Sequence, residues 1–177
     1  TLSIESRGPE GGFFDLCEYE DDVILPLDQV EPITIMKTDK NRKLRPYSYT
    51  ADALVFREDY FEVVEVKTTE DVDKLVKEQP DNWKRKDDGT VDFVPARLAF
   101  QEMGIRFRVF EYNAKMARLI LNIRMLLWSR DHVAKEFISK ADLDKAFAQS
   151  FCWTLSELRE HLELKDFTPL IHCIDRG

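Results

Sequence analysis

Three charged residues stand in two segments that otherwise have the composition of buried β-strands. Asp52 belongs to the run "YTADALVF", and Glu65 and Lys67 belong to the run "FEVVEVKT" that follows it. A charged group inside an apolar element costs on the order of several kcal/mol unless a counter-charge, hydrogen bonds or a metal ion compensates it. These three residues therefore either find partners within the fold or take part in chemistry.

Strand geometry predicts that the three side chains meet. Side chains alternate across a strand, so Glu65 and Lys67 project from one face, and Val64 and Val66 project from the other. A tight turn separates the two runs and predicts a hairpin, in which Asp52 and Glu65 converge at the open end. Two carboxylates that lie so close take up a proton unless a cation lies between them.

The predicted cluster fits metal-assisted hydrolysis of a phosphodiester bond. Carboxylate oxygens are ligands that Mg²⁺ and Mn²⁺ prefer, and a metal held there activates water. Lys67 beside such a site can stabilise developing negative charge or orient that water. The alternative is a buried ion network without catalytic role, because an Asp followed by Glu-x-Lys is common by chance. If the site is catalytic, Asp52→Ala and Lys67→Ala are expected to abolish cutting and to leave the protein folded or more stable.

The elements around this cluster predict an α/β domain. The pattern predicts a helix from about Glu10, β segments over 23–36, 47–56 and 61–68, a short helix near 70–78, a helix over 96–104 and a strand over 105–112. Pro26 confines its segment to a sheet edge or a strand start. Trp83 is expected to anchor a solvated loop.

The sequence after Tyr112 has a helical pattern. Helices are predicted over 114–129, 131–139, 140–150, 154–163 and 166–177. Thr154 and Glu157 form the S/T-x-x-E pattern of a capping box. Trp128 and Trp153 are expected in the core. We therefore divide the chain into residues 1–112 and residues 113–177.

Composition and charge narrow the function classes. The chain has 177 residues, 44% of them hydrophobic, which is typical of a globular protein. The net charge of −8 argues against unspecific coating of nucleic acid, yet residues 37–46 hold five bases and one acid. Such a run is either a phosphate-binding face or a solvated surface. Arg118 and Arg124 interrupt the longest apolar run, which excludes a membrane span there.

The cysteines and histidines show no metal-ligand spacing. Cys17, Cys152 and Cys173 are far apart, and no C-x-x-C pair exists. The sequence therefore favours reduced thiols in the cytoplasm over a zinc or redox site.

Taken together, these segments resemble a known nuclease superfamily. "YTADALVF" and "FEVVEVKT" resemble the PD-(D/E)XK nuclease core, with Asp52 as the Asp and Glu65-Val66-Lys67 as the E-x-K. "PEGGFFDLCEYEDDVI" resembles the N-terminal helix of TnsA-type transposon-end endonucleases, and "ARLAFQEMGIRFRVFE" is similar to the helix and strand that follow the E-x-K there. "TLSELREHLELKDFTPLIHCIDRG" resembles the winged-helix-like part of that family.

The resemblance implies a fold. It is a restriction-endonuclease-like mixed sheet flanked by helices over residues 1–112, followed by a small all-helical, winged-helix-like domain over 113–177. The sequence stops before the strands that a wing would need, so we expect this second domain to be truncated or degenerate.

The resemblance also implies the roles of particular residues. Glu10 would be a helix-borne metal carboxylate, with Glu5 as its rival. Asp52 would bridge the metals, Glu65 would be the third ligand, and the Val66 carbonyl often serves as a ligand in this fold. Lys67 would be the catalytic lysine. The implied cofactor is Mg²⁺, with Mn²⁺ able to substitute.

The function implied by the resemblance is that of a DNA endonuclease subunit in a heteromeric transposase. It would cut one strand of double-stranded DNA at each transposon end, while a partner DDE-type transposase cuts the other and an ATP-dependent regulator takes part. The setting would be the prokaryotic cytoplasm at the nucleoid, without a membrane. Two alternatives stay open: a stand-alone nuclease of a phage or defence system, and a non-catalytic DNA- or protein-binding subunit on the same fold.

Overall fold

The computed structural model describes residues 8–28, 30–131, 138–150 and 152–176, and it divides into two compact units. The first unit is Thr1–Ile120 and the second is Leu121–Gly177. The division falls within helix α4 (Ala114–Asp131), so the first turns of this helix belong to the first unit. The division predicted from the sequence, after Tyr112, lies just before that helix.

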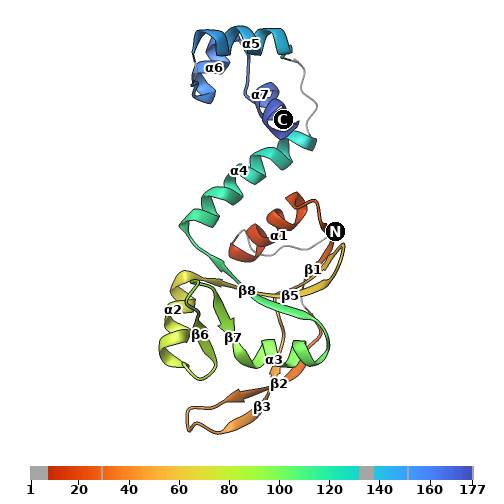
Figure 1. Cartoon of the computed structure of the whole chain (residues 1–177), viewed down its shortest axis with the longest axis vertical. Coiled ribbons are helices and arrows are strands. Elements are labelled where there is room, and N and C mark those ends of the chain that lie inside the picture. Colours follow the sequence, from red (N-terminus) through yellow and green to blue (C-terminus); the bar gives the residue numbers. More distant parts are fainter. Residues whose placement is uncertain (1–7, 29, 132–137, 151, 177) are drawn as a thin grey trace. The chain divides into compact units, whose positions relative to one another are not determined.

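A mixed four-stranded sheet forms the centre of the first unit (Figure 1). Its strand order is β1 (Val23–Asp28), β4 (Ala53–Arg57), β5 (Phe61–Thr68) and β8 (Arg106–Tyr112). Strands β1, β4 and β5 are antiparallel, whereas β8 runs parallel to β5. The predicted β4–β5 hairpin is therefore present. Pro26 lies in the edge strand β1, where its missing N–H costs the sheet no hydrogen bond.

The strand predicted over 47–56 is wrong, because this segment changes from one sheet to another. Strand β3 (Leu44–Tyr49) pairs with β2 (Ile33–Thr38) in a separate two-stranded sheet, and the chain leaves the strand conformation before β4 begins. The segment predicted over 23–36 is likewise divided between β1 and β2. Alternation of side chains continues across such a break, so periodicity alone does not reveal it.

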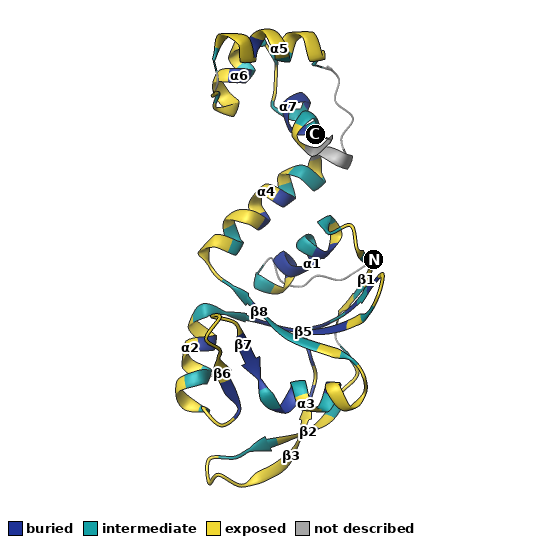
Figure 2. Ribbon diagram, in the orientation of Figure 1, coloured by how far each residue is buried: buried dark blue, intermediate teal, exposed yellow. Residues whose placement is uncertain are grey.

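Helices cover both faces of the four-stranded sheet. Helix α1 (Pro9–Tyr19) packs through Phe13 against Val64 and Val66. On the opposite face, α2 (Thr69–Glu78) and α3 (Val94–Glu102) contribute Val72 and Phe100 to a core that includes Val63. Figure 2 shows the buried residues on the sheet strands and on the helix faces turned toward them. The first unit thus has three layers, with β5 contacting both cores.

Helix α1 approaches α4 closely, which explains the glycines that the sequence places in a helix. A Cβ atom added at Gly12 would lie 2.9 Å from Ile120 Cδ1 and 3.2 Å from Tyr112 Cε2. Glycine in a helix interior costs about 0.5–1 kcal/mol relative to alanine. Here it allows the packing that holds the start of α1 against the sheet.

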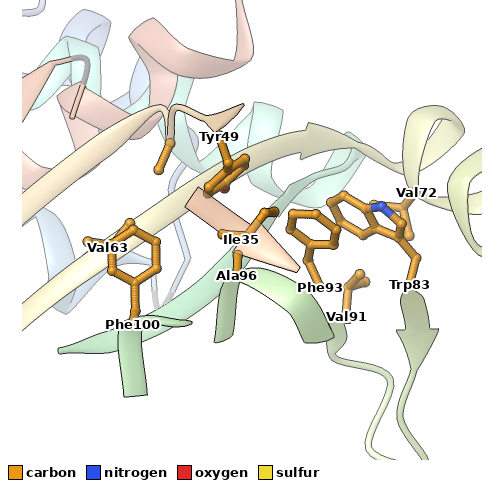
Figure 3. Packing of buried hydrophobic residues seen from close by; sticks show 10 residues of the cluster. Ile35, Tyr49, Val63, Val72, Trp83, Val91, Phe93, Ala96 and Phe100 are labelled. Atoms are coloured by element: carbon orange, nitrogen blue, oxygen red, sulfur yellow. The ribbon is translucent and has the colours of Figure 1, made fainter. Parts of the chain in front are cut away.

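A short hairpin was not predicted in the polar segment after α2. Strands β6 (Trp83–Arg85) and β7 (Val91–Phe93) pair, and Trp83 stacks on Phe93 with ring centroids 4.4 Å apart (Figure 3). Trp83 is only 4% exposed, so it does anchor this segment, but the segment is a hairpin and the expected loop is wrong. Strands of three residues are too short for alternation to be recognised in a sequence.

The second unit contains α5 (Lys140–Gln149), α6 (Leu155–His161) and α7 (Thr168–Arg176), and no strand among its described residues. Their core is formed by Ala146, Leu158 and Leu170. The predicted capping box is present at the start of α6. The Thr154 side chain accepts from the Glu157 N–H, and the Glu157 side chain accepts from the Thr154 N–H. The helix predicted over 131–139 lies largely outside the described residues.

The two tryptophans that were predicted to lie in the core differ in how far they are buried. Trp128 is 49% exposed, so that prediction is wrong, while Trp153 packs against the core of the second unit and donates to the Ala146 carbonyl. Across the described part of the chain, no helix combines the length and the apolar character needed to span a membrane.

Candidate functional site

The structure brings Asp52, Glu65 and Lys67 together at one end of strands β4 and β5. Asp52 directly precedes β4, and the other two residues lie near the end of β5. Lys67 Nζ is 2.6 Å from Glu65 Oε1 and 3.6 Å from Asp52 Oδ2. The same ammonium group donates to the Val66 carbonyl oxygen at 3.0 Å. Three oxygen atoms therefore surround one positive charge.

The break between β3 and β4 positions Asp52. The β4–β5 register pairs Ala53 with Val64, which places Asp52 opposite Glu65. Asp52 Oδ2 accepts a hydrogen bond from the backbone N–H of Val66 at 2.7 Å. The Asp52 side chain is thus hydrogen-bonded to β5 just before the first residue of β4. This contact holds the carboxylate next to Lys67.

Tyr49 orients Glu65 and was not singled out in the sequence. It ends strand β3, and its ring packs between Phe93 and Phe100 at centroid distances of 5.5 and 6.5 Å (Figure 3). Its hydroxyl donates to Glu65 Oε2, so the other oxygen of Glu65 is left for Lys67. No signal in the sequence pointed to this role, because the pattern predicted one strand that contains both Tyr49 and Asp52.

The charges of the site are strongly coupled. Burial raises the pKa of Glu65, and nearby Asp52 raises it as well, while Lys67 and the Tyr49 hydroxyl lower it. Burial lowers the pKa of Lys67, but the carboxylates of Glu65 and Asp52 outweigh this effect, and the pKa is raised. Lys67 is therefore a cation at neutral pH and does not serve there as a general base.

Glu10 lies beside the cluster without bonding to it. It is an exposed residue in the first turn of α1. Partial burial raises the pKa of its carboxyl, and the charge of Asp52 raises it further. Its rival Glu5 lies outside the described residues.

A cleft of about 610 Å³ joins Glu10 to the end of β5. Its walls come from the start of α1, the end of β5 and helix α2. The lining residues are Pro9, Glu10, Val66, Lys67, Thr68, Asp71, Lys74, Leu75, Glu78 and Gln79. The sequence did not predict that α2 lines this cleft, because that depends on how the helix packs against the sheet.

The donor atoms fit a hard divalent cation. Within the residues that the structure describes, no three Asp, Glu, His or Cys side chains gather as a metal-binding group. The oxygens that meet at Lys67 come instead from two carboxylates and one backbone carbonyl, all of them ligand types that Mg²⁺ and Mn²⁺ accept. Glu10 adds a third carboxylate along the cleft.

The comparisons with known proteins give no relatives. No protein-family model matches the chain, and no curated protein matches it. The functional argument therefore depends on the geometry of the site and on the pattern of the sequence.

Proposed function

We propose that the chain is a Mg²⁺-dependent DNA endonuclease of the PD-(D/E)XK type, similar to the TnsA subunit of heteromeric transposases. The observation that carries this proposal is the convergence of Asp52, Glu65 and the Val66 carbonyl around Lys67. The cleft beside them, with Glu10 on its wall, offers space for a phosphodiester.

Each residue has a role in this proposal. Asp52, Glu65 and the Val66 carbonyl would hold the metal, with Glu10 contributing from the cleft. When bound, Mg²⁺ supplies an activated water and neutralises charge on the phosphate. Lys67 keeps its proton and offers positive charge where negative charge develops. Tyr49 fixes one oxygen of Glu65, and the other oxygen, now paired with Lys67, would turn to the metal.

The fold supports the proposal at a coarser level. A mixed sheet with helices on both faces is what a restriction-endonuclease-like fold requires, and the E-x-K strand β5 is an inner strand of that sheet. The helical second unit would be the winged-helix-like part. In the proposed setting, in the prokaryotic cytoplasm, a DDE-type transposase cuts the other strand, an ATP-dependent regulator takes part, and double-stranded DNA is the substrate.

One observation favours a second candidate, a non-catalytic subunit with a structural ion network. The 2.6 Å contact between Lys67 Nζ and Glu65 Oε1 satisfies both charges without any metal. In this case the cluster would only join β4 to β5, and the chain would act by binding DNA or protein.

Direct measurement of Mn²⁺ binding separates the two candidates. An isolated nuclease subunit can be silent without its partner, so activity is a poor first readout. Crystals of the wild type soaked in Mn²⁺ are expected to show an anomalous peak beside Asp52 and Glu65. The Asp52→Asn variant keeps an oxygen for the Val66 N–H but is expected to lose the peak. An empty wild-type site at millimolar Mn²⁺ would contradict the proposal and favour the ion network.

A cleavage assay separates the transposase subunit from a stand-alone nuclease. Cutting that requires a second transposase protein would support the first. Efficient cutting of duplex DNA by the chain alone would favour the second.

A further inference from the structure

The β2–β3 hairpin carries the densest positive charge of the first unit on its turn. Residues 37–46 hold five bases and one acid, in a chain whose net charge is −8. Lys40, Arg42 and Lys43 are exposed, and among the described residues no carboxylate pairs with them. Figure 2 shows this end of the hairpin as an exposed surface.

The single acid of this hairpin is used inside the turn. Asp39 Oδ1 accepts from the N–H groups of Asn41 and Lys43 at 2.8 and 2.9 Å, and Oδ2 accepts from Arg45 Nε at 2.8 Å. These bonds lower the pKa of Asp39, so it stays ionised and bound to the backbone. The negative charge therefore shapes the turn, while the three unpaired cations project from it.

The hairpin is fixed to the body of the unit. Asn82, only 2% exposed, accepts from the Thr38 N–H and donates to the Thr38 carbonyl, both at 2.9 Å. The ammonium group of Lys37 lies over the Tyr47 ring, 5.3 Å from its centroid. A hairpin held beside its turn in this way presents its charges at a defined place, which lowers the entropy cost of binding.

The hairpin borders a second cleft, which shares lining residues with the cleft that contains Lys67. This cleft has a volume of about 570 Å³ and is lined by Lys37, Lys40, Arg42 and Arg45, among others. Glu78 and Gln79, at the end of α2, line both this cleft and the cleft that contains Lys67. The two clefts are therefore neighbours, with the end of α2 as a shared wall.

We propose that the β2–β3 hairpin is an arm that contacts the phosphate backbone of duplex DNA lying across the candidate active site. This inference rests on the proposed function, because it takes DNA as the substrate of the adjoining cleft. The positive turn complements the phosphates, and a two-stranded β-ribbon has dimensions that DNA grooves accept. The arm supplies affinity that the acidic remainder of the chain does not.

The test measures DNA binding without cleavage. Fluorescence anisotropy with a duplex of about two helical turns (about 20 bp) is recorded without divalent metal over a range of salt concentrations. The test variant carries Lys40→Gln, Arg42→Asn and Lys43→Gln. Asparagine suits position 42, where φ is 58°. A control variant removes the same charge from exposed lysines elsewhere in the unit, by Lys84→Gln, Lys86→Gln and Lys115→Gln.

DNA binding by the hairpin variant is expected to depend less on salt concentration than binding by the wild type. Each phosphate contact contributes about 0.9 to the slope of log K against log salt, so the slope should fall by about 3. The control variant should keep the wild-type slope. Equal slopes for both variants would overturn the inference, as would a wild type that binds no duplex at about 50 mM salt. Tighter binding to duplex RNA or to anionic lipid vesicles than to duplex DNA would also overturn it.

This outcome is separate from that of the Mn²⁺ experiment. A protein that binds Mn²⁺ but keeps its salt slope in the hairpin variant lacks the arm and retains the nuclease site. A protein that loses the slope but binds no Mn²⁺ has the arm without the nuclease.

Discussion

Strand β5 carries two buried glutamates, and their surroundings differ in a way that separates structure from function. Glu62 is 7% exposed and lies at the start of the strand. Glu65 is 6% exposed and lies near the end of the strand, on the opposite face. Glu62 Oε2 is 2.9 Å from Arg108 Nε and 3.4 Å from Arg57 Nε. One buried carboxylate thus faces two guanidinium groups.

The cluster around Glu62 is completed by further acids. Arg57 donates twice to Asp22, at 2.8 and 2.9 Å, and once to Glu20 at 2.8 Å. These contacts join the segment after α1 to β4 and β5. Three carboxylates thus share two guanidinium groups in this cluster.

The cluster around Glu65 contains less positive charge than the cluster around Glu62. Glu65 and Asp52 share the single ammonium of Lys67, and Glu10 adds a third negative charge nearby. Lys67 and Glu10 also line a cleft. Both glutamates are buried, so burial of a charged residue is not in itself a sign of function. The two clusters differ in the number of their cations and in the cleft beside Lys67.

The largest expected effect distinguishes the two glutamates directly. Glu65→Gln should lower metal-dependent cleavage by about 10³-fold, the scale of losing a group that stabilises transition-state charge. Its free energy of unfolding should fall less than that of Glu62→Gln, because Lys67 keeps the Asp52 carboxylate as a counter-charge. Glu62→Gln should leave cleavage unchanged and lower the free energy of unfolding by about 3 kcal/mol, because Arg108 loses its carboxylate and Arg57 keeps only Asp22 and Glu20. Cleavage per folded molecule and urea unfolding check both. If neither variant alters cleavage per folded molecule, the distinction between the two clusters fails.

Removal of the shared cation should destabilise the site in a pH-dependent way. Lys67→Met leaves Glu65 and Asp52 facing each other, so the pKa of Glu65 should rise further. A group with a raised pKa in the folded state adds stability at low pH and loses it as the pH rises through that pKa. The variant should therefore lose about 3 kcal/mol at neutral pH and less in acid. This prediction differs from the one made from the sequence, in which Lys67→Ala leaves the protein folded or more stable, because the structure places Lys67 between two carboxylates.

Addition of Mn²⁺ tests whether a metal can take the place of the lost ammonium group. Saturation at about 100 times the dissociation constant should return about 2.7 kcal/mol to the Lys67→Met variant. Lys74→Met, which removes an exposed lysine of the same cleft, serves as the control and should show neither effect. A Lys67→Met variant with the same stability at all pH values would contradict the coupling between the two carboxylates.

Glu10 should have a smaller effect than the carboxylates of the strands. It lies along the cleft and interacts with Asp52 through charge without a bond. Glu10→Gln should weaken Mn²⁺ binding by about 10-fold, the scale of losing an outer partner of a metal site. Glu18→Gln removes an exposed acid from the same helix and should leave Mn²⁺ binding unchanged. Identical affinities in titration calorimetry would exclude Glu10 from the site.

The smallest expected effect comes from Tyr49. Its hydroxyl lowers the pKa of Glu65, so Tyr49→Phe should move the acid limb of Mn²⁺ binding to higher pH. Stability should fall by about 1 kcal/mol, since a buried carboxylate oxygen loses its donor. Tyr47→Phe, at an exposed tyrosine of the hairpin, is the control. Coincident pH profiles would show that Tyr49 has only a packing role.

Local sequence was sufficient for the features that depend on neighbouring residues. The capping box of Thr154 and Glu157 and the turn between β4 and β5 are set within a few residues. The common face of Glu65 and Lys67 follows from the alternation of side chains in any strand. These elements could be predicted because their physics is short-range.

Tertiary structure decided the features that depend on pairing between distant segments. Only strand pairing shows that β3 leaves the main sheet, which brings Tyr49 to Glu65. The sequence identified Asp52, Glu65 and Lys67 as a cluster, but the placement of the lysine between the two carboxylates appears only in the folded chain. The sequence by itself therefore identified one of the buried charges, Glu65, and the two residues that lie beside it. Their partners were decided by the fold, because a charge selects its partner by distance in space.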